Sequence, residues 1–239
     1  MKAVAIIPAR MGSSRFPGKP LAPILGRSMI EHIYRRVERC GEVDEVYVAT
    51  CDREIADAVE AFGGRAIMTA DTHERASDRV ADAAQYVDAD VIVMVQGDEP
   101  MTTPEMVSAA LMPFKDGDVS CVNLIARIDD EAELRDKNAV KVTKDATGRA
   151  LLFTREPIPG AWKQLGIISF TRDALAEFAA LEPAALEIAE SIDMLRFLEH
   201  GRDIYLVETD TRSHAVDTPE DLAAVEKLML RDPLAASYA

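Results

Sequence analysis

Short apolar runs alternate with longer amphipathic stretches through the first 115 residues of the chain. The runs are mostly five or six residues long, such as AVAIIP at 3–8 and DVIVMV at 90–95, a length typical of buried strands. The stretches between them carry apolar residues at helical spacing. This order predicts βα units around a largely parallel sheet. The predicted strands are 3–8, 45–50, 65–68 and 90–95, and the predicted helices are about 29–39, 53–62 and 76–87, with another starting at Thr103-Pro104.

The rhythm changes after about residue 118. Strand-like segments follow one another with little helix between them, which indicates added antiparallel strands. These segments are 118–127, 139–143, 150–154 and 165–170, followed by a long helical region at 183–200 and a strand at 203–207. The last helix is expected to start at Asp217-Thr218-Pro219-Glu220, and the tail after residue 232 is expected to fray. The pattern as a whole predicts one α/β domain, with a mixed, mostly parallel central sheet flanked by helices and a small antiparallel sub-lobe.

The charge of the chain restricts its partners. The formal net charge is −15 over 239 residues, and a surface this negative repels nucleic-acid phosphates and anionic membranes. We therefore expect no nucleic-acid and no membrane partner. The three cysteines are widely spaced and the apolar start is too short for a signal peptide, so the cytoplasm is the expected compartment. Four histidines without metal-ligand spacing argue against a zinc site.

The loop after the first strand, IPARMGSSRFPGKPL at 7–21, concentrates positive charge in an otherwise acidic chain. Arg10, Arg15 and Lys19 can bind phosphate, while Gly12 and Ser13 permit a tight backbone path whose N–H groups can face an anion. The loop starts at the carboxyl end of a buried parallel strand, where open α/β folds bind ligands. We interpret it as a polyphosphate-binding loop. The alternative is a solvated basic loop, and neither GxxxxGK[ST] nor GxGxxG is present.

Two acidic turns are candidates for holding a divalent cation. Asp98 closely follows the buried strand 91–95, and Asp217 lies in the turn before the last predicted helix. Magnesium is typically held by one or two carboxylates together with phosphate oxygens and water. The pair therefore predicts a Mg²⁺ site. Each aspartate also has a structural explanation, since Asp98 can serve a turn and Asp217 can cap a helix.

Six motifs occur in the order seen in the 3-deoxy-manno-octulosonate cytidylyltransferases, also called CMP-Kdo synthetases, which the chain resembles from about residue 2 to residue 230. They are IPARMGSSRFPGKPL, VQGDEP, NAVKV at 138–142, LLFTREPIP, LGI and VDTPEDL. The resemblance implies a Rossmann-like nucleotidyltransferase (nucleotide-diphospho-sugar transferase) fold with CTP at the sheet edge. It also implies a cytoplasmic homodimer that uses Mg²⁺, CTP and an acidic sugar to make CMP-Kdo for lipopolysaccharide biosynthesis, with release of pyrophosphate.

Site residues follow from the resemblance by matching positions. Those implied to bind the nucleotide are Ala9, Arg10, Gly12, Ser13, Arg15, Lys19, Ser77 and Arg79. Those implied to act in catalysis are Arg10, Lys19 and Asp98, with Asp98 and Asp217 holding the metal. Those implied to bind the sugar acid are Gln96, Arg155, Gln164, Glu187, Glu190 and Asp193. The nucleotide-binding half would span about 1–115, the sugar-binding and dimerisation portion about 116–215, and the C-terminal helix about 217–231.

The sugar half departs from the family pattern. Arg75-Ala76-Ser77-Asp78-Arg79 stands where SGTER is common, Gln164 replaces the usual His, and Met194 replaces a common Gln. The aromatic that usually follows LGI is replaced around 168–169, and the segment between 159 and 164 is short. Lost polar partners should weaken the recognition of a polyhydroxylated sugar.

Four functions stay open at this point. The first is transfer of CMP from CTP to Kdo or a Kdo-like acid, by in-line attack of a sugar hydroxyl on the α-phosphorus and without a covalent enzyme intermediate. The second is a nucleotidylyltransferase of the same fold that acts on a different acid sugar, a phosphonate or a sugar phosphate. The third is a transferase that uses a finished nucleotide-sugar and releases no pyrophosphate. The fourth is a catalytically silent nucleotide-binding module.

Overall fold

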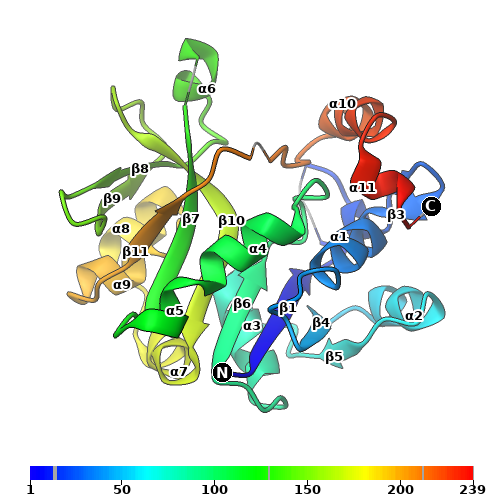
Figure 1. The fold of residues 1–239 in the computed structure, drawn as a ribbon, viewed down its shortest axis with the longest axis horizontal. Coiled ribbons are helices and arrows are strands. Elements are labelled where there is room, and N and C mark those ends of the chain that lie inside the picture. Colours follow the sequence, from blue (N-terminus) through cyan, green and yellow to red (C-terminus); the bar gives the residue numbers. More distant parts are fainter. Residues whose placement is uncertain (13–14, 129, 212, 239) are drawn as a thin grey trace.

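A nine-stranded mixed sheet forms the centre of the molecule (Figure 1). It is seen in a computed structural model that describes residues 1–12, 15–128, 130–211 and 213–238. The strand order is β11-β7-β10-β6-β1-β4-β5, with β8 paired to the start of β10 and β9 paired to β8. The strands of this sheet are β1 (Ala3–Ala9), β4 (Glu45–Thr50), β5 (Ala66–Met68), β6 (Val91–Val95), β7 (Cys121–Arg127), β8 (Lys141–Lys144), β9 (Ala150–Thr154), β10 (Trp162–Thr171) and β11 (Tyr205–Glu208).

Most strands of the sheet are parallel. β5, β4, β1 and β6 run in one direction, and β11 runs parallel to β7. β10 is antiparallel to its neighbours β6 and β7, and β8 and β9 form an antiparallel hairpin against its first residues. A separate antiparallel pair consists of β2 (Pro23–Ile24) and β3 (Arg27–Ser28). The predicted mixed, mostly parallel sheet with an antiparallel sub-lobe is confirmed.

The alternation of side chains along the strands builds two cores, one on each face of the sheet. On β6, Val91, Val93 and Val95 belong to one core, and Ile92 and Met94 belong to the other. Helices complete both cores. The first receives residues of α1 (Met29–Val37), α2 (Arg53–Ala61), α4 (Pro104–Leu111) and α10 (Pro219–Met229). The second receives residues of α3 (Ala76–Ala84), α7 (Arg172–Ala180) and α9 (Leu195–Glu199). Helices on both faces explain why these strands are apolar on both sides. Among the described residues, no helix is both long and apolar enough to cross a bilayer.

The helices connect the strands in the order that the sequence predicts for the first half of the chain. They are η1 (Lys19–Leu21, a 3₁₀ turn), α1 (Met29–Val37), α2 (Arg53–Ala61), α3 (Ala76–Ala84), α4 (Pro104–Leu111), α5 (Pro113–Asp116), α6 (Glu131–Arg135), α7 (Arg172–Ala180), α8 (Ala185–Glu190), α9 (Leu195–Glu199), α10 (Pro219–Met229) and α11 (Pro233–Ala236). α4 begins as predicted, because the Thr103 side chain accepts a hydrogen bond from the backbone of Met106 and Pro104 takes the first position.

The helices of the second half differ from the predicted pattern in two places. The segment after β10 forms α7, which the sequence analysis did not predict; the Thr171 side chain caps it by accepting a hydrogen bond from the backbone of Ala174. The region 183–200 is not one helix, because Ser191 adopts the left-handed conformation with φ 55° and separates α8 from α9. Asp193 lies in the segment between the two helices, where its carboxylate accepts hydrogen bonds from Ser77.

The C-terminal tail is ordered against α1, so the prediction that it frays is also wrong. α11 brings Tyr238 to the buried Arg36, whose Nε donates a hydrogen bond of 2.8 Å to the tyrosine hydroxyl. Asp232 forms an ion pair with the same guanidinium. A buried guanidinium needs acceptors, and the tail supplies two of them.

Candidate functional site

The ends of β1 and β6 place the basic loop and the first aspartate side by side. The two strands are neighbours and parallel, so their carboxyl ends lie at the same edge of the sheet. The turn after β6 packs directly against the end of β1, because a Cβ atom on Gly97 would lie 2.4 Å from the carbonyl oxygen of Pro8. Only glycine fits this close approach. Asp98 is thereby held next to the loop that follows β1.

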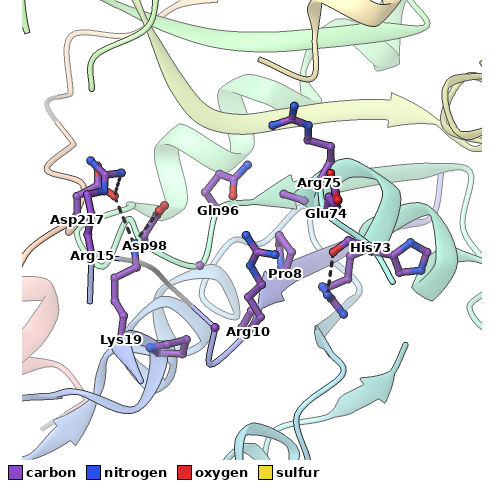
Figure 2. A pocket seen from close by; sticks show the side chains of 16 residues that line it. Pro8, Arg10, Arg15, Lys19, His73, Glu74, Arg75, Gln96, Asp98 and Asp217 are labelled. Carbon is purple, nitrogen blue, oxygen red and sulfur yellow. Dashed lines mark hydrogen bonds and ion pairs between the residues drawn. The ribbon is translucent and has the colours of Figure 1, made fainter. Parts of the chain in front are cut away.

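Lys19 lies between the two predicted metal ligands (Figure 2). Its Nζ is 3.1 Å from Oδ2 of Asp98 and 3.6 Å from Oδ1 of Asp217, and it donates a hydrogen bond of 2.6 Å to the carbonyl oxygen of Val216. The lysine side chain is 11% exposed. The backbone N–H of Val216 in turn donates to the carbonyl oxygen of Asp98, at 2.8 Å. Three segments that lie far apart in the sequence therefore meet at one point.

Two clefts adjoin at this point. The loop cleft, of about 310 Å³, lies between the basic loop and the segment 73–79 at the start of α3. The bulge cleft, of about 290 Å³, lies beside an irregularity of β10 between Gln164 and Ile168. Both clefts are lined by Arg15, Gln96, Asp98 and Asp217. A ligand in one cleft would therefore meet a ligand in the other at the two aspartates.

The cations of the loop cleft differ in how they are held. Arg15 is 2.9 Å from the carboxylate of Asp217 and also donates a hydrogen bond to the side chain of Asn138. Arg10 is exposed, lines the cleft, and makes no ion pair or hydrogen bond with any residue that the structure describes. In Figure 2 its side chain extends from the end of β1 into the cleft. Arg10 is thus a cation free to bind an anionic ligand.

The two aspartates suit a hard divalent cation. Their side chains are 34% and 24% exposed, and Lys19 occupies the space where a cation would balance their charge. Within the described ranges, no three His, Cys, Asp or Glu side chains form a metal-binding group. Two carboxylates without a soft ligand match Mg²⁺, which takes its remaining ligands from phosphate and water. Asp98 and Asp217 are therefore the residues that could hold it.

The bulge cleft combines polar groups with an apolar floor. Gln164, Arg155 and Asp193 line it, as do the buried side chains of Met94 and Met194.

These three polar side chains are each fixed by a hydrogen bond to a residue outside the bulge cleft. Nε2 of Gln164 donates to Oδ1 of the buried Asn123 at 2.6 Å, Nε of Arg155 donates to the carbonyl oxygen of Glu190 at 2.9 Å, and Oδ2 of Asp193 accepts from the hydroxyl of Ser77 at 2.8 Å.

Some predicted site residues lie outside both clefts. Ser77, predicted to bind the nucleotide, is fully buried and bonded to Asp193. Glu187, predicted to bind the sugar, is fully buried and pairs with Arg196 at 2.7 Å. Glu190, also predicted to bind the sugar, accepts hydrogen bonds from the hydroxyl of Thr154 and the backbone of Arg155. These three side chains hold residues of the cleft walls. Ser77 bonds to Asp193 and Glu190 to Arg155, both of the bulge cleft, and Glu187 lies 3.9 Å from Arg75 of the loop cleft.

The remaining predicted residues that the structure describes each line at least one of the two clefts. Those of the loop cleft are Ala9, Arg10, Gly12, Arg15, Lys19, Arg79, Gln96, Asp98 and Asp217, and the bulge cleft adds Arg155, Gln164 and Asp193. Arg79 is only 3% exposed, and its guanidinium donates to the side chain of Thr69 and the carbonyl oxygen of Ala70, so it mainly holds the neighbouring loop. Ser13 lies outside the described residues.

Sequence reasoning missed the side chains that organise the bulge cleft. Glu99 is 7% exposed; its Oε1 accepts from the backbone N–H of Gly166 and its Oε2 from the hydroxyl of Ser213, both at 2.7 Å. Burial raises the pKa of Glu99, and the neighbouring charge of Asp98 acts in the same direction. The signal was its place in VQGDEP, directly after the candidate metal ligand, but a glutamate in a turn reads as exposed.

A buried lysine explains the NAVKV motif. Lys141 is fully buried, and its ammonium donates to the carbonyl oxygens of Asp136, Ala139 and Arg155. Burial lowers the pKa of Lys141. The lysine thereby ties the loop that carries Asn138 to the end of β9. The start of α3 was also underestimated, since His73, Glu74 and Arg75 line the loop cleft.

The chain is similar to known cytidylyltransferases in both sequence and structure. A family model described as Cytidylyltransferase matches residues 4–209. The 3-deoxy-manno-octulosonate cytidylyltransferase of Geobacter metallireducens is 44% identical over 249 residues, covering 95% of this chain and 98% of that protein. The solved structure of a CMP:2-keto-3-deoxy-manno-octonic acid synthetase complexed with CTP superposes with a TM-score of 0.91 at 39% identity, covering 97% and 99% of the two chains. The 4-diphosphocytidyl-2C-methyl-D-erythritol synthase of Anaerococcus prevotii, at 16% identity and a TM-score of 0.68 over 96% and 99%, shares the fold alone.

Proposed function

The chain belongs to the 3-deoxy-manno-octulosonate cytidylyltransferase family, and from this premise we propose that it transfers CMP from CTP to Kdo and releases pyrophosphate. One observation carries the proposal at the level of the site. Two clefts of similar size adjoin, and Arg15, Gln96, Asp98 and Asp217 line both. A triphosphate in the loop cleft and a sugar acid in the bulge cleft would bring the α-phosphorus and the attacking hydroxyl together at these shared residues.

The reaction is an in-line displacement at phosphorus. A bond forms between the sugar hydroxyl oxygen and the α-phosphorus, the bond from that phosphorus to the bridging oxygen of the β-phosphate breaks, and the hydroxyl proton is released to water. The chain's part is positioning and charge stabilisation, as is general for such transfers. Arg10, Arg15 and Lys19 lie where they would bind the phosphates and the departing pyrophosphate.

Asp98 and Asp217 are the residues that would hold Mg²⁺. The ion would neutralise phosphate charge and orient the triphosphate. Lys19, which contacts both carboxylates in the structure, would keep them from repelling one another before the nucleotide binds. In the bulge cleft, Arg155 and Gln164 would hold the sugar acid.

The cellular setting completes the proposal. We expect a cytoplasmic homodimer that supplies CMP-Kdo for lipopolysaccharide biosynthesis. Free thiols at Cys40, Cys51 and Cys121 support a reducing compartment. Exposed apolar side chains on the sub-lobe, Leu151 on β9 and Ile188 on α8, support an interface there, and light scattering of the purified protein would test the dimer.

A pyrophosphate-release assay tests the reaction. Purified protein with Mg²⁺ is given CTP, UTP, dTTP or ATP, and each nucleotide is combined with Kdo, with amino-substituted 2-keto-3-deoxy acids, or with a sugar 1-phosphate. We expect release with CTP and Kdo, and formation of CMP-Kdo by mass spectrometry. Release only with a sugar 1-phosphate would favour the sugar-phosphate alternative. Absence of release with every pair, although CTP binds, would favour a silent module.

A further inference from the structure

Glu99 joins two segments that carry opposite sides of the reaction site. Its Oε1 accepts a hydrogen bond from the backbone of Gly166, in the irregularity of β10 that lines the bulge cleft. Its Oε2 accepts from the hydroxyl of Ser213, four residues before Asp217. Both bonds are 2.7 Å long and the side chain is 7% exposed. One carboxylate therefore connects the wall of the bulge cleft to the segment that carries Asp217.

The connection leaves little freedom for the bulge. The backbone N–H of Gln96 donates to the carbonyl oxygen of Gly166 at 2.8 Å, so the turn 96–99 and the bulge are linked in both directions. A Cβ on Gly166 would lie 2.6 Å from Cγ of Gln96 and 2.7 Å from Oε1 of Glu99. The backbone of the bulge thus rests directly on the turn that carries Asp98.

The chemistry of Glu99 argues for positioning and against a purely stabilising role. The backbone N–H of Gly166 and the hydroxyl of Ser213 both donate in this structure, and the two oxygens of the carboxylate accept one bond each. Glu99 is 7% exposed and forms no ion pair with a residue in the described part of the chain, and an acidic group buried without an ion pair opposes folding. A residue that is unfavourable for stability but bonded to both sides of a reaction site is best explained by the geometry it fixes.

We propose that Glu99 is a positioning residue that sets the bulge cleft against Asp98 and Asp217, and so holds the sugar hydroxyl in line with the α-phosphorus. This inference rests on the proposed function. A displacement of about 1 Å at such a site can lower the rate about 100-fold. Because Glu99 lines the bulge cleft and not the loop cleft, its loss should leave CTP binding nearly unchanged.

The test compares Glu99→Ala, Glu99→Gln and Ser213→Ala with the wild type. In Glu99→Gln the amide oxygen can accept from Gly166 and the amide nitrogen can donate to Ser213, so this variant should recover most of the activity. Glu99→Ala should lower kcat/KM for the sugar acid about 10- to 100-fold, as removal of groups that orient a metal site typically does. Ser213→Ala, which removes one of the two bonds, should have a smaller effect in the same direction. The KM for CTP should stay near the wild-type value in all three.

Hydrogen exchange of the Gly166 amide, measured by NMR without substrate or metal, gives a readout that is independent of turnover. We expect faster exchange in Glu99→Ala and near-normal exchange in Glu99→Gln. Thr103→Ala is the control, since it removes the cap of α4 near Glu99 and touches neither cleft. It should lower the unfolding temperature without changing kcat/KM.

Three outcomes would overturn the inference. Glu99→Ala could match Thr103→Ala, with lower stability and normal kinetics. Glu99→Gln could be as inactive as Glu99→Ala, which would show that the charge and not the pair of hydrogen bonds is needed. Unchanged exchange at Gly166 in a folded Glu99→Ala protein would also contradict it. If Glu99→Ala does not fold, wild-type kcat/KM for the sugar acid in Ser213→Ala would contradict it instead. A wild-type protein that releases no pyrophosphate would refute the proposed function, while the exchange experiment would still decide whether Glu99 holds the bulge.

Discussion

The two clefts of this molecule hold their polar side chains in different ways. In the loop cleft, the two aspartates pair with the cations Lys19 and Arg15, and Arg10 has no described partner. Gln164, Arg155 and Asp193 line the bulge cleft but not the loop cleft, and each is fixed by a residue outside both clefts, as Gln164 is by Asn123.

This difference determines how function and stability can be separated. A group held only by other site residues can be removed with little change to the fold, because each partner keeps other contacts, as Lys19 keeps Asp217 and the carbonyl oxygen of Val216 when Asp98 is changed. A group bonded to a buried partner leaves that partner unsatisfied, which costs about 1–3 kcal/mol of stability. We therefore expect variants of the loop cleft to change kinetics alone, and variants of the bulge cleft to change kinetics and stability together.

Asp98→Asn should give the largest effect and the clearest separation. The substitution removes one of two carboxylates that would hold Mg²⁺, and the loss of metal charge stabilisation, several kcal/mol, corresponds to a fall in kcat of about 1,000-fold or more. Asparagine keeps an oxygen that can accept from Lys19, and Lys19 keeps its contacts with Asp217 and the carbonyl oxygen of Val216. The unfolding temperature should therefore hardly change. Steady-state pyrophosphate release and thermal unfolding measure the two effects.

The matched control for that variant is Asp173→Asn, an exposed aspartate in the first turn of α7 that lines neither cleft. It should behave as the wild type in both assays. Near-normal turnover of Asp98→Asn would remove the role we give this aspartate, and a large drop in stability would break the contrast between the clefts.

Arg10→Ala should give the next largest effect, and it too should affect kinetics alone. A hydrogen bond from a charged donor to phosphate is worth about 1.5–3 kcal/mol, so the KM for CTP should rise about 10- to 100-fold. Arg10 has no described partner to leave unsatisfied, and unfolding should be unchanged. CTP titration by calorimetry checks the affinity. Arg10→Lys keeps the charge but loses the bidentate geometry, so its affinity for CTP should lie between those of Arg10→Ala and the wild type. Equal CTP affinity in Arg10→Ala and the wild type would mean that this arginine does not contact the nucleotide.

Asp193→Ala should affect both properties, which is the reverse of the pattern expected for Arg10. Oδ2 of Asp193 accepts from the backbone N–H of Ser77 at 3.2 Å and from its hydroxyl at 2.8 Å, so it caps the first turn of α3. Losing that acceptor should lower the free energy of unfolding by about 1–3 kcal/mol. The KM for the sugar acid should rise while the KM for CTP changes less. Asp193→Asn, which keeps one acceptor oxygen, should recover part of the stability; a variant that lost sugar affinity with no change in urea unfolding would contradict the coupling.

The same contrast separates what the sequence predicts from what it does not. The basic loop, Asp98 and the start of α10 are local signals: each is a short string of residue types at the end of a strand or the start of a helix, and the structure has each element where the pattern places it. The parallel order of β1 and β6 then brings the loop to the first aspartate. Asp217 was paired with Asp98 because both lie in acidic turns that could hold one cation, and the family resemblance implied the same pair; no local rule relates residues so far apart in the chain.

The bulge cleft depends on pairings that no short pattern encodes. Ser77 and Asp193 are 116 positions apart in the chain. Gln164 on β10 donates a hydrogen bond to Asn123 on the neighbouring strand β7. The acidic helix shows why prediction fails there: Glu187 and Asp193 look alike in the sequence, but the left-handed Ser191 lies between them. One carboxylate is consequently buried on Arg196 and the other lines the cleft. Burial of Glu99 was likewise unpredictable, because it depends on a bulge and a distant serine.

Thr218→Ala should give the smallest effect and completes the comparison, because α10 is capped locally whereas α3 is capped from a distance. The Thr218 hydroxyl accepts from the backbone N–H of Asp221, and the Asp221 carboxylate accepts from the backbone N–H of Thr218, all within four residues. Removing the hydroxyl should lower the free energy of unfolding by about 1 kcal/mol, measured by urea denaturation. Asp221 also accepts from the backbone N–H of Asp217 at 3.0 Å, and this bond survives, so kcat should stay close to the wild-type value. A loss of activity comparable to that of Asp98→Asn would show that the loop cleft depends on its supporting structure as strongly as the bulge cleft does.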